Sequence, residues 1–137
     1  MKYFKFEELL RSQVAIDNDI LNEPNRWGEG YVYFRLCSLV EHLLDPIRER
    51  FAVSMIITSG YRCERVNKLV GGASNSQHRK GEAVDFYFEG FGKKEMAAAF
   101  FEIAENFDFD QLIYYKKKGF MHISYSEDNN RHQSFMK

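Results

Sequence analysis

The chain has 137 residues, of which 45% are hydrophobic and 16% aromatic, and this length and composition predict one folded domain spanning residues 1–137. Its 19 Lys and Arg nearly balance its 20 Asp and Glu, so the strong basic excess typical of a nucleic-acid-binding protein is absent. No apolar segment approaches the roughly 18 residues that a membrane-spanning helix needs.

The N-terminus and the cysteines indicate the cellular compartment in which the protein is made. Residues 1–8 become acidic before an apolar segment begins, so we expect no signal peptide. Cys37 and Cys63 form no CxxC pair and favour a reduced chain without a disulfide. We therefore expect a protein that is cytoplasmic as synthesised, and we expect a monomer without a nucleic-acid or membrane partner.

The N-terminal half is predicted to be mainly helical. Apolar side chains in residues 31–51 recur at steps of three and four and form one stripe, and Pro46 is expected to kink this helix near its end. In chain order, the pattern predicts a short helix over 6–12, a polar loop over 17–30, the long helix over 31–51, a buried strand over 53–58 and a short helix over 63–70.

The C-terminal half is predicted to supply most of a sheet. We expect a polar loop over 73–81, a strand over 82–88, a long helix over 93–106, strands over 111–115 and 120–125, and a polar tail after residue 127. The last two strands are joined by a hairpin loop that holds the only basic run, Lys116 to Lys118. Helices first and strands later predict an α+β domain with a small, mostly antiparallel sheet and helices packed on one side.

One constellation of residues indicates chemistry. His78 falls in the loop, Asp85 in the strand over 82–88 and His122 in the last strand. Because side chains alternate along a strand, Asp85 and His122 lie opposite the more apolar face of their strands. Two imidazoles and one carboxylate suit a catalytic zinc ion. The spacing alone is not specific, because a strand histidine is more often a partly buried residue and Asp85 also suits a turn cap.

Several ordered motifs surround these residues. Ser76, His78, Gly81, Ala83 and Asp85 fit the pattern SxHxxGxAxD, ITSGYR occupies 57–62 and MHIS occupies 121–124. These motifs resemble those of zinc D-Ala-D-Ala carboxypeptidases and of the L-alanyl-D-glutamate endopeptidases of phage lysis systems, whose fold is shared with the hedgehog signalling domain. VGGASNSQH at 70–78 and FDQLI at 109–113 resemble the short phage and mobile-element branch.

The resemblance implies a zinc metallopeptidase that acts on peptidoglycan stem peptides, as a D,D-carboxypeptidase or an endopeptidase. It implies that His78, Asp85 and His122 bind Zn²⁺ and that zinc-bound water attacks the scissile carbonyl. Without a signal peptide, such an enzyme would act at the cell wall after lysis or export.

The resemblance also implies substrate contacts. Arg62 matches the arginine that contacts the substrate and developing negative charge, and its planar guanidinium suits a carboxylate. The alternative is a surface ion pair of Arg62 with Glu64 or Glu82. Ser76 and Gln77 are expected to hydrogen-bond the substrate or support the loop.

The general base usual in such peptidases is missing. Residues 114–121 contain no carboxylate, and pairing across the hairpin puts Tyr115 on the face of His122, about where close relatives have Glu. A phenol with a pKa of about 10 is a poor base at neutral pH. Asp110 is interpreted as a strand-start residue rather than the base. A catalytically weak or inactive zinc-dependent module that binds cell-wall peptides is therefore the alternative, and a metal-free structural domain is a third interpretation.

Overall fold

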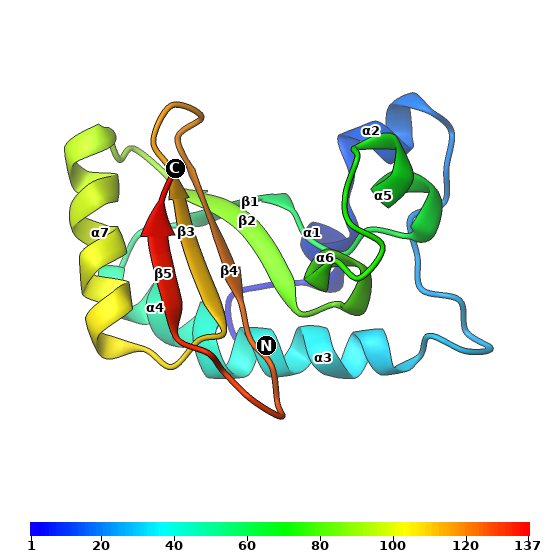
Figure 1. The fold of residues 1–137 in the computed structure, drawn as a ribbon, viewed down its shortest axis with the longest axis horizontal. Helices are drawn as coiled ribbons and strands as arrows, with labels where there is room; N and C mark the ends of the chain where they lie inside the picture. Colours follow the sequence, from blue (N-terminus) through cyan, green and yellow to red (C-terminus); the bar gives the residue numbers. More distant parts are fainter.

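A five-stranded mixed sheet is at the centre of the computed structural model, which describes residues 1–137 (Figure 1). The strands are β1 (Met55–Ser59), β2 (Ala83–Phe88), β3 (Gln111–Tyr115), β4 (Phe120–Ser124) and β5 (Gln133–Met136). Across the sheet their order is β1-β2-β4-β3-β5, and every pair is antiparallel except β3 and β5. The predicted α+β class is confirmed.

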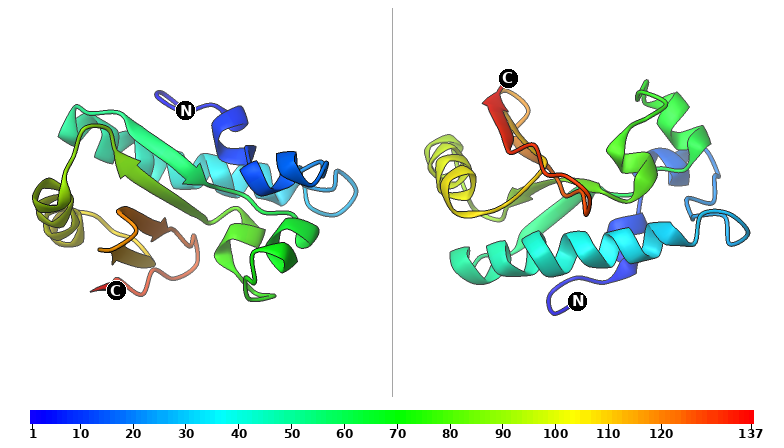
Figure 2. Two further views of the ribbon diagram at one scale, coloured as in Figure 1. Left: turned by 90° about the horizontal axis from the view of Figure 1, so that it is seen from above. Right: turned by 60° about the horizontal axis from the view of Figure 1, so that its bottom comes forward.

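Helices surround this sheet, with α7 (Lys93–Asn106) apart from the other two groups. They are α1 (Phe6–Leu10), α2 (Gln13–Asp17), α3 (Tyr31–Leu39), the π-helical segment η1 (Val40–Leu44), α4 (Asp45–Phe51), α5 (Glu64–Leu69), α6 (Gln77–Lys80) and α7 (Lys93–Asn106). Figure 2 shows α3, η1 and α4 as one continuous rod along a face of the sheet. The short helices α1, α2, α5 and α6 gather beyond one end of β1 and β2 (Figure 1). No helix is long and apolar enough to cross a membrane.

The alternation of side chains in β2 and β4 separates an apolar face from a polar one. The apolar face contributes Val84, Phe86, Phe88, Met121 and Ile123, all fully buried. They form one core with apolar side chains of the rod and of α7, including Leu36, Leu43, Ile47, Met96, Phe100 and Ile103. Because the rod and α7 cover this face, Asp85 and His122 lie on the opposite face of β2 and β4.

The long helix predicted over 31–51 is present, but Pro46 does not end or break it. An interior proline lacks one backbone donor, and its ring collides with the carbonyl four residues earlier. The π turn η1, which directly precedes α4, widens the helix at this point, and Pro46 lies in the first turn of α4. The rod therefore continues to Phe51.

Two short helices differ from the prediction. The helix expected over 6–12 ends at Leu10, and α2 begins after Ser12, whose Oγ accepts a hydrogen bond from the backbone N–H of Ala15. The polar segment expected to be a loop over 73–81 contains α6, with Ser76 as its N-cap. Helices this short carry too little hydrophobic periodicity to be distinguished from loops, and their caps are the main sequence signal.

The polar tail contains β5, which was not predicted. Gln133 and Ser134 are exposed, so no apolar alternation marks this strand. Buried Asp110, immediately before β3, accepts hydrogen bonds of 2.9–3.0 Å from the backbone and guanidinium of Arg131. This ion pair holds the tail against the edge of β3, which makes the sheet mixed. Cys37 and Cys63 are both free, as expected.

Candidate metal centre

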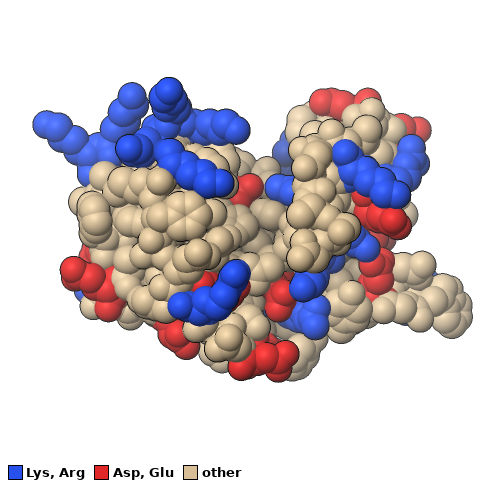
Figure 3. All heavy atoms as spheres, viewed as in Figure 1, with Lys and Arg blue, Asp and Glu red and all other residues tan.

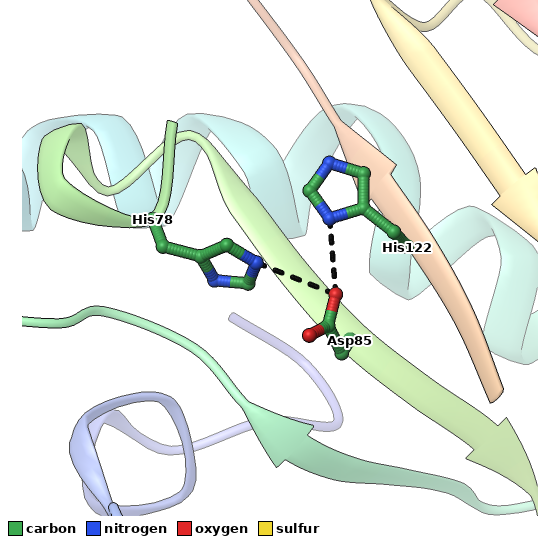
Figure 4. Close-up of side chains that lie close together, drawn as sticks. All are labelled: His78, Asp85 and His122. Atoms are coloured by element: carbon green, nitrogen blue, oxygen red, sulfur yellow. Dashed lines mark hydrogen bonds and ion pairs between the residues drawn. The ribbon is translucent and has the colours of Figure 1, made fainter. Parts of the chain in front are cut away.

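Three side chains converge on the polar face of the sheet. His78 Nε2 lies 3.3 Å and His122 Nδ1 3.0 Å from the same oxygen, Oδ1 of Asp85 (Figure 4). One ligand atom from each residue lies within 4.8 Å of the others. Ligands about 2.1 Å from a tetrahedral zinc ion lie about 3.4 Å apart, so the two shorter separations are close to those of a zinc site and the group could hold a metal ion.

The backbone explains why these residues meet. Asp85 of β2 and His122 of β4 are direct partners across the antiparallel pair. His78 lies in α6, where its backbone N–H donates to Ser76 Oγ at 3.2 Å. Gly81 ends α6 with a φ of +77°, and a Cβ there would lie 2.8 Å from the carbonyl oxygen of Val32. A residue without a side chain is therefore required for the chain to turn from α6 into β2.

Which ring nitrogen of His78 carries the proton decides whether the other nitrogen is free to bind a metal. Nδ1 of His78 lies 2.8 Å from the carbonyl oxygen of Gly60, and because a carbonyl only accepts, Nδ1 carries the proton. In a neutral imidazole Nε2 then presents a lone pair to Asp85 Oδ1, which is also an acceptor. A divalent cation between the two satisfies both. The donor set of two imidazoles and one carboxylate, with an outer partner on His78, fits Zn²⁺.

Asp85 is held in its anionic form. Burial by itself raises the pKa of its carboxyl, but the adjacent imidazoles of His122 and His78 outweigh burial and hold the pKa well below the usual range. Its backbone carbonyl accepts a hydrogen bond of 3.2 Å from Thr58 Oγ1. The register of β1 against β2 shifts between Ile57 and Ser59, next to Asp85. Irregularities of this kind are frequent beside functional sites.

Arg62 lies beside this cluster. Its Nη2 is 3.8 Å from Asp85 Oδ2, and its other nitrogens reach Ser59 Oγ and Asn67 Oδ1 at 3.4 Å each. Its side chain is only 18% exposed. The alternative of a surface ion pair with Glu64 or Glu82 is wrong, because Glu64 pairs with Lys68 at 3.3 Å and the one carboxylate paired with Arg62 is that of Asp85.

Arg62 also lines a cavity of about 220 Å³ on the side of α2 and α5. The apolar part of its wall comes from Val14, Val66 and Val70, and Thr58 and Ser59 contribute hydroxyl groups. We call this the Arg62 cavity. The guanidinium therefore lies between Asp85 and a small, partly apolar space.

Ser76 and Gln77 have different environments. The Oγ of Ser76 caps α6, which supports the loop that carries His78. Gln77 lines a separate, wholly polar cavity of about 450 Å³ together with Glu82, Asp110 and Arg131. The structure does not place Gln77 in the Arg62 cavity.

Tyr115 shares the sheet face of His122. The predicted pairs of Tyr115 with Phe120 and of Ile113 with His122 are both present. The ring of Tyr115 stacks on Phe120, with the ring centroids 4.7 Å apart. Burial raises the pKa of the Tyr115 hydroxyl, the charge of Asp85 raises it further and Arg62 lowers it. Tyr115 is therefore within electrostatic range of the cluster.

No second carboxylate faces the cluster. Asp110 is held by Arg131, as described above. Glu82 lies an odd number of residues before Asp85, which places it on the opposite face of the chain, and it lines the polar cavity. Neither Asp110 nor Glu82 is therefore placed to serve as the general base that is missing from residues 114–121.

Sequence reasoning missed the groups that position the ligands, above all Gly60 and Thr58. Gly60 supplies the carbonyl that orients His78, and a Cβ on it would collide with the carbonyl oxygen of Leu9. The glycine in ITSGYR was the only sequence sign of this role. The requirement for glycine comes from a contact with Leu9 of α1, which is distant in sequence.

Comparison with protein families gives a match over most of the chain. A family model described as peptidase M15 matches residues 2–124, a span that includes all three candidate ligands, Arg62 and Tyr115 and ends with β4. No curated protein matches the chain.

The first prediction concerns metal retention. We expect His122→Ala and Asp85→Asn each to weaken zinc binding by more than about 100-fold, because loss of an outer partner alone costs about 10–100-fold and each change removes a ligand. Zinc content measured by native mass spectrometry after dialysis tests this. His42→Ala, which alters a histidine outside the cluster, is the control and should retain zinc. Stoichiometric zinc in both ligand variants would refute the assignment.

Proposed function

The chain belongs to the peptidase M15 family, and from this premise we propose that it is a zinc metallopeptidase that hydrolyses peptidoglycan stem peptides. The observation that carries the proposal is the convergence of His78 and His122 on one oxygen of Asp85. Stem peptides lie outside the cytoplasmic membrane, so the proposed substrate implies access after lysis or export.

His78, Asp85 and His122 would hold the ion through Nε2, a carboxylate oxygen and Nδ1. When bound, Zn²⁺ supplies a Lewis acid and lowers the pKa of a coordinated water to about 7. With one carboxylate among three ligands, the protein neutralises only half of the dication's charge. The remaining positive charge favours a carbonyl oxygen that becomes negative during attack.

Arg62 is proposed to bind the substrate. Its guanidinium is largely buried, and burial lowers its pKa while Asp85 raises it. Beside it, the valine walls of the Arg62 cavity enclose a volume of about 220 Å³. A small C-terminal residue such as alanine suits these walls, and its carboxylate suits the guanidinium. These features support a carboxypeptidase more than an endopeptidase.

The alternative is a zinc-dependent module that binds cell-wall peptides with weak or no hydrolysis. The specific observation in its favour is that Asp85, a proposed ligand, is the only carboxylate facing the cluster. Loss of a general base typically costs about 10²–10⁴ in rate. Tyr115 is proposed to orient the substrate carbonyl or a water, which a phenol can do without accepting a proton.

The second prediction is hydrolysis that depends on the metal. We expect the zinc-loaded protein to release D-alanine or a shorter peptide from a stem pentapeptide, to lose this activity on chelation and to regain it when zinc is restored. Chromatography of the products provides the measurement. Zinc-dependent binding of peptidoglycan without any cleavage would support the binding module instead.

The third prediction concerns Arg62. We expect Arg62→Lys to lower kcat/KM about 10–100-fold, since lysine keeps the charge but loses the planar fork. Thermal unfolding should change little. Arg65→Lys, at an exposed neighbouring position of α5, is the matched control and should retain full activity. Equal activity of the Arg62 variant and wild type would show that Arg62 does not bind the substrate.

The fourth prediction concerns the missing base. We expect Tyr115→Glu to raise hydrolysis near neutral pH about tenfold, which corresponds to about 1.4 kcal/mol of barrier, because a carboxylate accepts a proton where a phenol does not. Initial rates and zinc content are measured together. Tyr115→Phe keeps the stacking ring and should show no gain. A Glu variant that binds zinc normally but is no faster would contradict this placement of Tyr115.

A further inference from the structure

The turn between β3 and β4 forms a concave basic surface with the last residue of the chain. A cavity of about 380 Å³ is lined by Tyr115, Lys116, Lys117, Lys118 and Lys137 and by no other residue. We call it the lysine pocket. Its walls carry four ammonium groups, although the whole chain has a formal net charge of −1.

Lys137 comes to the pocket through β5, the strand that the sequence pattern did not reveal. Its backbone N–H donates to the carbonyl of Tyr114 at 2.9 Å, and its carbonyl accepts from the N–H of Lys116 at 3.0 Å. Its ammonium lies 5.6 Å from the ring centroid of Tyr115 and 5.8 Å from that of Phe135. The fourth lysine is thus anchored by the sheet at a defined position beside the turn.

The lysines of the pocket form no ion pair with an aspartate or glutamate side chain. The ion pairs of the structure that involve lysine are those of Lys2 with Glu49 and Lys68 with Glu64. The three lysines of the turn and Lys137 are exposed. Figure 3 shows basic side chains gathered over the end of the molecule that holds this turn, almost without acidic atoms among them. A concave cluster of unpaired cations attracts an anion.

The lysine pocket lies on the same sheet face as the candidate metal centre. Tyr115 belongs to both: it lines the pocket, and it shares the sheet face of His122. Phe120, its partner across the hairpin, is two residues before His122 in β4, and the turn lies just beyond. At a rise of about 3.3 Å per residue, the pocket begins about 10 Å from the ligands, which an extended peptide covers in about three residues.

We propose that the lysine pocket binds a carboxylate of an acidic peptide substrate, about three residues from the bond that is cut. The proposal rests on the proposed peptidase function and adds to it a preference for substrates with a free acid at that position. Arg62 and the lysine pocket then hold the peptide on opposite sides of the metal centre, because Arg62 follows β1 and the pocket lies on β3 and β5 at the other edge of the sheet.

A peptide carboxylate fits these observations better than a membrane or an extended polyanion. The cations surround a cavity of about 380 Å³ rather than forming a long flat stripe. The pocket also shares Tyr115 with the face of the metal centre, which a peptide already held near the metal would meet.

The fifth prediction tests this preference by binding. Two stem pentapeptide analogues with a non-hydrolysable reduced amide at the scissile bond are compared. One carries a free glutamate carboxylate, and in the other this carboxylate is amidated. We expect the zinc-loaded wild type to bind the acid about tenfold more tightly, which corresponds to about 1.4 kcal/mol, and to lose the preference at high ionic strength.

Two triple variants locate the effect. Lys116→Gln, Lys117→Gln and Lys118→Gln together should abolish the preference while affinity for the amidated analogue stays unchanged. Lys5→Gln, Lys93→Gln and Lys94→Gln remove the same three charges at exposed positions outside the pocket and should keep the preference. Equal binding of both analogues by wild type, or a preference that survives in the first triple variant, would overturn the proposal.

Two further measurements separate the possible failures. If wild type cleaves the acidic and amidated pentapeptides with equal kcat/KM, the carboxylate preference is wrong and the peptidase function stands. If neither is cleaved but the lysine-dependent binding preference is observed, the hydrolytic function fails and the binding site stands. Lysine-dependent binding to phosphatidylglycerol vesicles, without discrimination between the two analogues, would assign the pocket to a membrane surface and overturn the proposal.

Discussion

The buried carboxylate of Asp85 is the charge around which the site is organised. A buried anion is costly unless it is paired, and here two imidazoles and a guanidinium approach it from three separate segments of the chain. Its place in β2, with a fully buried apolar face behind it, fixes its direction. The register of β4, the capped turn of α6 and the irregular end of β1 all bring a compensating group to this one carboxylate.

Two of the candidate ligands, Asp85 and His122, come from the middle of the sheet, and the basic groups lie on either side of the cluster. Arg62 and its cavity lie on the side of β1, α2 and α5, and the lysine pocket lies on β3 and β5. Figure 3 shows a hollow between the surface over α2 and α5 and the surface over the sheet. An overall charge near zero therefore conceals an uneven distribution of charge, which is why composition alone did not indicate these basic sites.

Strands with strict alternation were predictable, and so was the face that carries Asp85, His122 and Tyr115, because parity depends only on local sequence. What could not be predicted depends on contacts between distant segments. The strand β5 exists because Arg131 pairs with Asp110 beside an open sheet edge. The role of Gly60 depends on Leu9, some fifty residues earlier. The family resemblance of the motifs pointed to the three candidate ligands, and the geometry supplied the partners that orient them.

Gly60 and its neighbour join the first helix to the metal centre through a single short stretch of backbone. The N–H of Tyr61 donates to the carbonyl of Leu9 at 2.8 Å, and the carbonyl of Gly60 accepts from His78 Nδ1 at 2.8 Å. Because no ligand set exists until the chain folds, metal binding is linked to folding. The affinity of this cluster for zinc would therefore depend on how well the N-terminal segment packs, so substitutions in α1 that never approach the ion would alter how tightly it is held.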